Sequence, residues 1–221
     1  MAEDNVKLTG FKQHWKDWSV PMLKLHWKKA QFNPWHFLTQ FVYTTDPHDP
    51  EHSIKLFPPK TYLEFLVSTW LREKRLVVEK SRKMIITWCM LALHLWLASR
   101  TPGAFIYFQS QKEDKADRLI QRAYHIWKYL PELLRPQAVY TYCKLKFPVL
   151  DSIIQGVPQG TDVIMDETVT AIFSDEQSTQ EQAEEAFMIA KPTIDAGGRY
   201  TAVGTARAAC FMKRLVFDEL E

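Results

Sequence analysis

The sequence RLVVEKSRKMIITW, residues 75–88, decides the fold. Residues 76–78 form a short apolar run that predicts a buried strand, and Thr87 opens a long apolar segment that predicts a helix. A basic loop joins the two. A strand, a loop and a helix that begins at a hydroxyl residue form the layout of a phosphate-binding loop, because the free backbone N–H groups at a helix N-terminus attract anions.

This loop departs from the usual pattern G-x-x-x-x-G-K-[ST] at three positions. With Thr87 at the final hydroxyl position, where it can ligate magnesium, Lys80 and Ile85 replace the glycines and Ile86 replaces the lysine. A β-branched isoleucine resists the positive φ angles that glycine adopts, so we expect a different loop path or weak binding. Three cations of the loop can reach a phosphate: Lys80, Arg82 and Lys83. An ordinary basic turn is the alternative interpretation.

The composition indicates a folded chain of one large domain, or of one domain with an extension. It has 221 residues, 46% of them hydrophobic. The net charge of +2 is small, so contact with nucleic acid would need a local basic patch. Three cysteines without C-x-x-C spacing argue against a zinc site or a disulfide framework. Neither a signal peptide nor a bilayer-spanning run is visible, so we expect an intracellular protein without a membrane partner.

We expect residues 1–50 to form a helical extension and residues 51–221 to form the nucleotide-binding domain. The extension mixes lysines with tryptophans, which fits either a partner-binding or nucleic-acid-binding arm or an amphipathic helix laid on the body. In many ATPases the segment before the phosphate loop packs on the adenine base. The candidates for base contact here are Phe57, Lys60 and Tyr62, with core packing as the alternative.

The pattern after the loop alternates between helix and strand. Residues 104–108 predict a second strand, and residues 110–131 predict an amphipathic helix. Residues 139–147 alternate like one half-exposed strand. Residues 152–155 should pair with that strand, which would make an antiparallel addition to the sheet.

Two arginines, Arg118 and Arg122, lie one turn apart on the outer face of the helix predicted within residues 110–131. Such a pair is often a solvated face. The sharper interpretation is that one of them reaches the nucleotide of a neighbouring subunit.

A second motif, TAIFSDE, occupies residues 170–176. Its apolar strand runs directly into Asp175 and Glu176, and α/β sheets carry catalytic groups at the carboxyl ends of their strands. Hydrolytic phosphoryl transfer needs one carboxylate for the magnesium hydration shell and another to polarise the attacking water. A carboxylate pair about ninety residues after a phosphate-loop candidate is the Walker B pattern.

The remaining motifs follow this strand. Residues 178–181, STQE, predict a capping box for a helix that Pro192 should end. Residues 199–203 predict a further strand that runs into Thr205. In ATPases that couple hydrolysis to movement, a hydroxyl residue at this place senses the γ-phosphate; a simple turn residue is the alternative.

The set resembles the ATPase domain of the large terminase subunit, the DNA-packaging motor of tailed bacteriophages. The resemblance extends from about Asn33 to Ala206 and is carried by four segments: FPPKTYLEFL, VVEKSRKMIITW with its S-R-x-M core, AIFSDEQ and GGRYTAVGTA. It implies an α/β, three-layer P-loop NTPase fold of the ASCE or RecA-like class. The central sheet would be mainly parallel with an antiparallel addition.

The resemblance also implies roles for individual residues. The phosphate-binding loop would use Lys80, Ser81, Arg82 and Lys83. The magnesium ligands would be Thr87 and Asp175. Glu176 would be the catalytic glutamate and Thr205 part of the coupling motif. The arginine that acts between subunits of a ring would be Arg118 or Arg122.

The implied function is that of an ATP hydrolase that uses ATP and Mg²⁺ to drive double-stranded DNA into a procapsid. Its partners would be the portal protein and the small terminase subunit, in the host cytoplasm, with a homo-oligomeric ring as the active form and a monomer in isolation. Family members carry a C-terminal nuclease, for which no sequence remains here after Glu221, so we expect no DNA cleavage. Two alternatives are a helicase-like DNA translocase and a nucleotide-binding assembly module without turnover.

Overall fold

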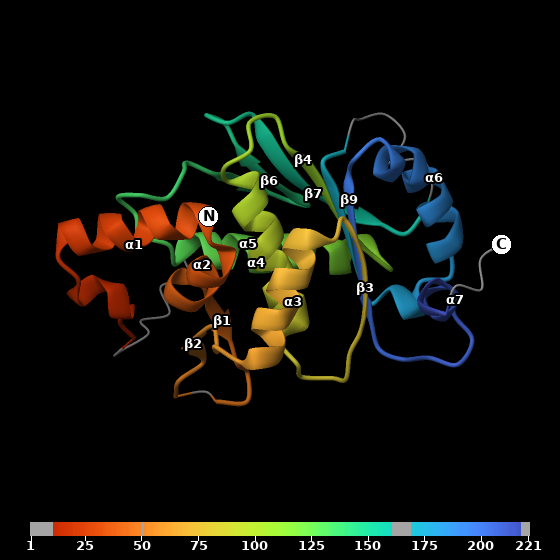
Figure 1. The fold of residues 1–221 in the computed structure, drawn as a ribbon, viewed down its shortest axis with the longest axis horizontal. Coiled ribbons are helices and arrows are strands. Elements are labelled where there is room, and N and C mark those ends of the chain that lie inside the picture. Colours follow the sequence, from red (N-terminus) through yellow and green to blue (C-terminus); the bar gives the residue numbers. More distant parts are fainter. Residues whose placement is uncertain (1–10, 50, 161–168, 218–221) are drawn as a thin grey trace.

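The computed structural model describes residues 11–49, 51–160 and 169–217. Its centre is a seven-stranded sheet of order β3-β9-β8-β4-β7-β6-β5 (Figure 1). Its strands are β3 (Arg75–Glu79), β4 (Phe105–Ser110), β5 (Val139–Thr141), β6 (Lys144–Phe147), β7 (Ser152–Pro158), β8 (Ala171–Asp175) and β9 (Arg199–Gly204). The strands from β3 to β7 in the sheet order are parallel, while β6 and β5 are antiparallel to their neighbours. The predicted α/β class, with a mainly parallel central sheet and an antiparallel addition, is therefore confirmed.

Helices cover both faces of this sheet and make three layers (Figure 1). Alternate residues of β4 lie on opposite faces of the sheet. Ile106 and Phe108 belong to the apolar cluster on one face, and Tyr107 belongs to the cluster on the other. The first cluster includes α4 (Ile86–Ala98) and α5 (Glu113–Lys128), and the second includes α6 (Ala183–Asp195). The last helix is α7 (Phe211–Val216). Helix α4 is buried along most of its length, as its apolar sequence predicts.

The N-terminal segment shares the core of the sheet. Its elements are a short 3₁₀ helix (His14–Asp17), α1 (Val20–Phe32), α2 (Pro34–Phe41), β1 (Tyr43–Thr45), β2 (Ile54–Leu56) and α3 (Thr61–Arg72). The indole of Trp96 on α4 donates to the carbonyl of Ala30 at the end of α1, over 2.8 Å. The expected boundary at residue 50 falls between β1 and β2, which pair with each other. Two domains divided at this point stay a prediction.

The single strand predicted over residues 139–147 is wrong. The segment is a hairpin of β5 and β6, with Cys143 in its turn at a φ of 54°. Asp117 of α5 fixes the turn, because its carboxylate accepts hydrogen bonds from the Cys143 backbone N–H (2.7 Å) and the Tyr140 hydroxyl (3.2 Å). The turn contains no glycine or asparagine, so no residue in the sequence signals it. The alternating pattern of residues 139–147 therefore looks like that of a single strand. The predicted antiparallel pairing with β7 is confirmed.

The predicted capping box is also wrong. Ser178 lies in a short 3₁₀ helix, Gln177–Thr179, and α6 begins later, after Gln182 and without a side-chain cap. Pro192 does not end α6, which continues to Asp195. Proline is tolerated there because the carbonyl that loses its partner belongs to Met188, a residue that is 57% exposed. No helix among the described residues is long and apolar enough to cross a membrane.

Candidate active site

The loop between β3 and α4 has a left-handed backbone at two residues that are not glycine. Lys83 has a φ of 65° and Ile85 a φ of 59°, and Ile85 caps α4. Ile85 therefore adopts the positive φ that a β-branched residue resists, whereas the expected alternatives of a different loop path or weak binding stay predictions. The conformation costs about 1–2 kcal/mol for such a residue, and neighbouring contacts hold it. The Tyr62 hydroxyl donates to the carbonyl of Met84 (3.0 Å), and the side chain of Ile85 packs on the core.

Thr87 and Asp175 meet at the N-terminus of α4. The Thr87 hydroxyl donates to Asp175 Oδ1 over 3.0 Å. Burial, and secondarily the negative charge of Glu176, raises the pKa of Asp175 to about 6, while the Thr87 hydrogen bond and the charges of Lys80 and Arg122 act in the opposite direction. A hydroxyl beside a buried carboxylate is an oxygen donor set that suits Mg²⁺, which takes few protein ligands and keeps several waters.

Glu176 lies directly beside the loop. Its backbone is left-handed (φ 52°), and its carboxylate accepts a hydrogen bond from Lys80 Nζ over 2.9 Å. The Lys80 side chain is 9% exposed and the Glu176 side chain 44%. Strands β3 and β8 both flank β9, which brings their carboxyl ends together. Lys80 is thus the ion-pair partner of Glu176 in this structure and does not line the cavity described next.

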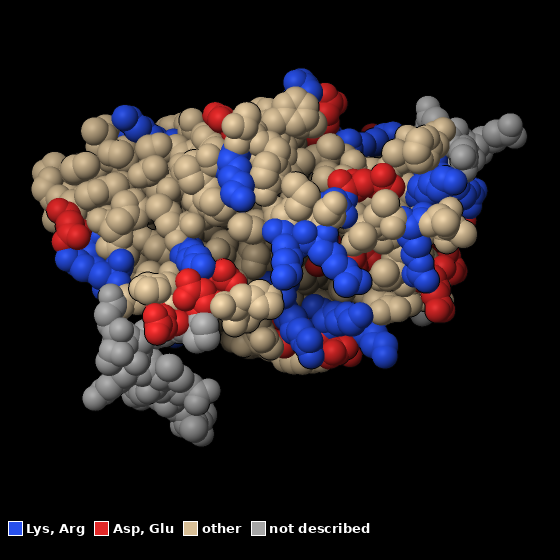
Figure 2. All heavy atoms as spheres, turned by 90° about the horizontal axis from the view of Figure 1, so that it is seen from below, with Lys and Arg blue, Asp and Glu red and all other residues tan. Residues whose placement is uncertain are grey.

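A cavity of about 640 Å³ opens at the carboxyl ends of the strands. The predicted site residues that line it are Arg82, Thr87, Arg118, Arg122, Asp175, Glu176 and Thr205. Five cations and two carboxylates face it, the cations being Arg82, Lys115, Arg118, Arg122 and Arg207. Figure 2 views this end of the molecule and shows Lys and Arg side chains gathered in its middle. The excess positive charge suits a polyanionic ligand such as a triphosphate.

Several lining residues were missed from the sequence. They are Ser110, Gln111, Lys115, Leu119, Ser178, Thr179, Ala206 and Arg207. Ser110 and Gln111 stand at the carboxyl end of β4, so the rule that located Asp175 would also have found them. No pattern marks Lys115 or Arg207.

Behind the site, Gln180 holds the end of β8. Its side-chain amide donates to Ser174 Oγ (3.1 Å) and to the backbone carbonyl of Asp175 (2.9 Å). Next to it, Gly204 lets β9 approach closely, because a Cβ at this position would lie 2.6 Å from Met212 Sδ and 3.1 Å from the Ser178 backbone nitrogen. The hydrogen bonds of Gln180 position the carboxyl end of β8, and the close packing at Gly204 positions the carboxyl end of β9.

A second cavity, of about 560 Å³, lies on the other side of the loop. Lys83 lines this second cavity and is not among the residues that line the first. Lys60 also lines it, together with the apolar surfaces of Ile85 and Trp88. Phe57 is completely buried in the core cluster, which favours the core-packing alternative, and its contact with a base stays a prediction.

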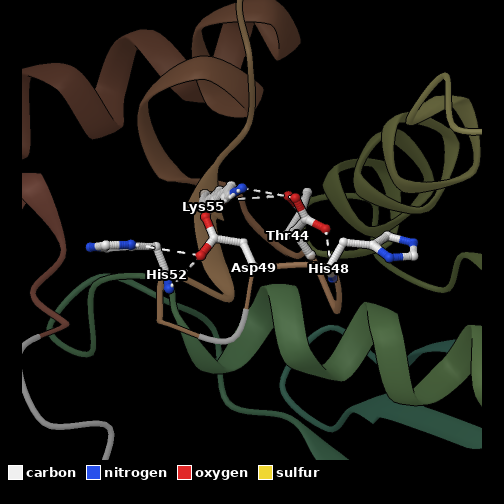
Figure 3. Close-up of polar contacts among 6 residues, drawn as sticks. Thr44, His48, Asp49, His52 and Lys55 are labelled. Atoms are coloured by element: carbon white, nitrogen blue, oxygen red, sulfur yellow. Dashed lines mark hydrogen bonds and ion pairs between the residues drawn. The ribbon is translucent and has the colours of Figure 1, made fainter.

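The hairpin of β1 and β2 forms a wall of the second cavity and is held by a small ion-pair cluster (Figure 3). Lys55 Nζ lies 2.8 Å from Asp46 Oδ2 and 3.0 Å from Asp49 Oδ2. The same carboxylates accept hydrogen bonds from the backbone N–H groups of His48 (3.1 Å) and His52 (3.0 Å). Hydrogen bonding to Lys55 lowers the pKa of both carboxyls, so both are ionised at neutral pH.

The sequence matches no protein-family model and no curated protein. Solved structures do match. The ATPase domain of the large terminase of Thermus phage P74-26 aligns with a TM-score of 0.57 at 14% identity, over 71% of this chain and 68% of that one. The large terminase of bacteriophage HK97 aligns with a TM-score of 0.66 at 11% identity, over 85% of this chain and 40% of that one. This chain thus spans less than half of the HK97 protein. It has the fold of the ATPase domain of phage large terminases.

Proposed function

We propose that this chain is the ATPase motor of a viral terminase, which hydrolyses ATP with Mg²⁺ to move double-stranded DNA into a procapsid. One observation carries the hydrolytic part. Thr87, Asp175 and Glu176 line one cavity together with five cationic side chains, and the Thr87 hydroxyl donates to Asp175. This is the arrangement that hydrolysis of a phosphoanhydride needs, with oxygen donors for a metal, a carboxylate for water and cations for phosphates.

Each group has a distinct task in this proposal. Thr87 and Asp175 would hold Mg²⁺, which would supply positive charge next to the phosphates. Arg82 is the loop cation that faces the phosphates, since Lys80 pairs with Glu176 and Lys83 faces the second cavity. Glu176 accepts a proton from the attacking water, and Thr205, at the end of β9, senses the terminal phosphate.

The second cavity is the proposed place of the nucleobase. Trp88 and Ile85 offer apolar surface to a base, and Lys60 supplies a polar contact at its edge. Trp88 follows Thr87 directly in α4, so the two cavities lie on either side of the same helix start. Tyr62 supports the loop between them through its hydrogen bond to Met84 and does not line either cavity.

The proposed role in DNA movement is supported by the similarity of the fold. The similar structures are large terminases, and contact with DNA phosphates would be salt-dependent and indifferent to sequence. We propose a ring of copies as the active form, with the portal protein and the small terminase subunit as partners in the host cytoplasm. The isolated chain would be a monomer.

Phosphate release from ATP and Mg²⁺ tests the hydrolytic proposal. We expect wild-type turnover and a loss of about 100-fold or more in Glu176→Gln, because the amide cannot accept the proton. Glu185→Gln, an exposed carboxylate on α6, is the matched control and should keep wild-type turnover. Equal rates for Glu176→Gln and wild type would contradict the assignment.

A nucleotide-binding module without turnover is the second candidate. It is favoured by the ion pair in which Lys80 engages the carboxylate that would activate water. That candidate predicts bound ATP without phosphate release at any protein concentration, in the presence or absence of double-stranded DNA.

A further inference from the structure

Helix α1 lies at one end of the molecule and exposes an apolar stripe (Figure 1). Leu23 and Ala30 are buried and hold the helix to the body. Pro21, Leu25 and Phe32 lie on the opposite side, since a helix turns by about 100° per residue. Leu25 is 54% exposed and Phe32 82%. These three residues form the α1 stripe, which runs for about 16 Å along the helix.

Lysines border the α1 stripe on both sides. Lys24 and Lys28 follow one edge of it, and Lys29 follows the other. All three are exposed, and none forms an ion pair with another residue in the described part of the chain. The sequence has no aspartate or glutamate between Asp17 and Asp46. This segment therefore does not neutralise the positive charge on its own surface.

We propose that this face of α1 binds an amphipathic helix of a partner protein. The apolar side of that helix packs on Leu25 and Phe32, and its flanking aspartates or glutamates pair with the three lysines. Charge complementarity carries the inference, because an apolar stripe between two rows of charge is what one helix presents to another. The inference goes beyond the proposed function and does not depend on ATP hydrolysis.

The pattern of the surface favours a protein helix over other anionic partners. DNA phosphates would pair with the lysines but would leave Leu25 and Phe32 in water. A helix that lies in a membrane surface has a wide apolar face and carries its lysines on the opposite side. In α1 the opposite side packs on the protein through Leu23 and Ala30, and the exposed stripe is narrow. A partner helix uses both the apolar and the charged parts.

Helix α1 is held in place at its C-terminal end by α4. The indole of Trp96 and the guanidinium of Arg100 both donate to the carbonyl of Ala30, over 2.8 Å and 3.3 Å. Arg100 also donates to the carbonyl of Gln31. Carbonyls in the last turn of a helix have no partner within the helix, so these bonds fix its end. A surface that is fixed before the partner arrives loses little conformational entropy on binding.

The first test measures the binding of two labelled synthetic peptides by fluorescence anisotropy. Both are amphipathic helices about three heptads long with the same leucine stripe, flanked by glutamates in one peptide and by lysines in the other. We expect wild type to bind the glutamate peptide about tenfold or more tightly than the lysine peptide, with a preference that falls as salt is added. Equal affinities would overturn the inference.

The apolar contact is tested by the double variant Leu25→Ser, Phe32→Ser. It should bind the glutamate peptide about tenfold or more weakly than wild type, because the apolar anchors are removed. The matched control is Phe65→Ser, Leu71→Ser, which changes an exposed phenylalanine and an exposed leucine on α3. The control should stay within about twofold of wild type. Wild-type affinity in the α1 double variant would overturn the inference.

Charge reversal tests the lysines. Lys24→Glu combined with Lys28→Glu should invert the preference, so that the lysine peptide binds more tightly than the glutamate peptide. Lys112→Glu combined with Lys191→Glu changes two exposed lysines outside α1 and should keep the wild-type preference. A preference that the reversal on α1 leaves unchanged would overturn the inference.

The other occupants of this face are tested with the same α1 double variant, Leu25→Ser, Phe32→Ser. The probes are a short DNA duplex and vesicles of phosphatidylcholine and phosphatidylglycerol in equal parts, and sedimentation measures self-association. The inference predicts that the variant changes none of these results. Duplex binding, vesicle binding or a dimer that the variant abolishes would overturn it in favour of that occupant. None of these measurements uses turnover, so a failure of the proposed hydrolysis leaves them valid.

Discussion

Asp175 carries a charge in a place where charge is unfavourable. It is 7% exposed, and its pKa of about 6 lies above the 3.8 of an ordinary aspartate, chiefly because of burial. The unfolded chain loses this proton first as the pH rises, so the contribution of this group to the free energy of unfolding falls between about pH 4 and pH 6. At pH 7 the loss is about 3 kcal/mol.

We therefore expect the free energy of unfolding of Asp175→Asn to exceed that of wild type by about 1–3 kcal/mol at pH 7 without Mg²⁺. In urea unfolding, the variant should have the higher midpoint. The asparagine oxygen can still accept the hydrogen bond of Thr87. The gain should shrink toward pH 4, and turnover should be lost. Asp151→Asn, whose side chain is 82% exposed, is the control and should stay within about 0.5 kcal/mol of wild type. A less stable Asp175→Asn at pH 7 would contradict this account.

At the scale of single residues, the sequence is informative where a group ends a strand or begins a helix. Thr87, Asp175 and Thr205 could be predicted as cavity residues for this reason. The pairing of Lys80 with Glu176 could not, because the two are 96 residues apart and meet only through the order of the strands. The direction of Lys83 depends on its positive φ, which its residue type does not predict.

At the scale of elements, α4 buries His94 and α5 partly buries His125. Burial lowers the pKa of His94 to about 3 and of His125 to about 4. Both remain neutral in the folded protein at pH 5, whereas the unfolded chain takes up a proton at each near pH 6.5. Stability is therefore present above pH 6.5 and is lost as the pH falls toward the folded pKa values.

We expect the free energy of unfolding to fall by about 2 kcal/mol for each of these histidines between pH 7 and pH 5. Urea unfolding over this range measures the loss. The slope of the free energy of unfolding against pH reports the number of protons taken up on unfolding. His125→Gln should reduce this slope by up to one proton, while His52→Gln, at a side chain that is 78% exposed, should leave it unchanged. A slope in His125→Gln that equals that of wild type would show that His125 is not kept neutral by the fold.

Elements with strong periodicity were predictable to within a few residues. Strands β3, β8 and β9 and helices α3, α4 and α5 lie where their patterns place them. The failures occurred where a distant contact overrides a local signal. Asp117, which lies on α5, accepts a hydrogen bond from the turn between β5 and β6. Ser178 lies in the 3₁₀ helix after Glu176, so it does not cap α6.

At the scale of the whole molecule, parallel topology explains why the site could be located at all. Carboxyl ends of parallel strands meet at one edge, so motifs far apart in sequence had to converge there. The position of the N-terminal helices could not be predicted in this way. Their contact with α4 depends on individual partners, such as the hydrogen bond from Trp96 to Ala30.

The central claim is that Glu176 activates water for attack on an ATP whose Mg²⁺ would be held by Thr87 and Asp175. The most direct measurement is the identity of the nucleotide that stays on the protein after incubation with radiolabelled ATP and Mg²⁺. We predict ADP on the wild type and intact ATP on Glu176→Gln, with similar total binding. ADP on both proteins at equal rates would contradict the claim, as would the absence of bound nucleotide from both.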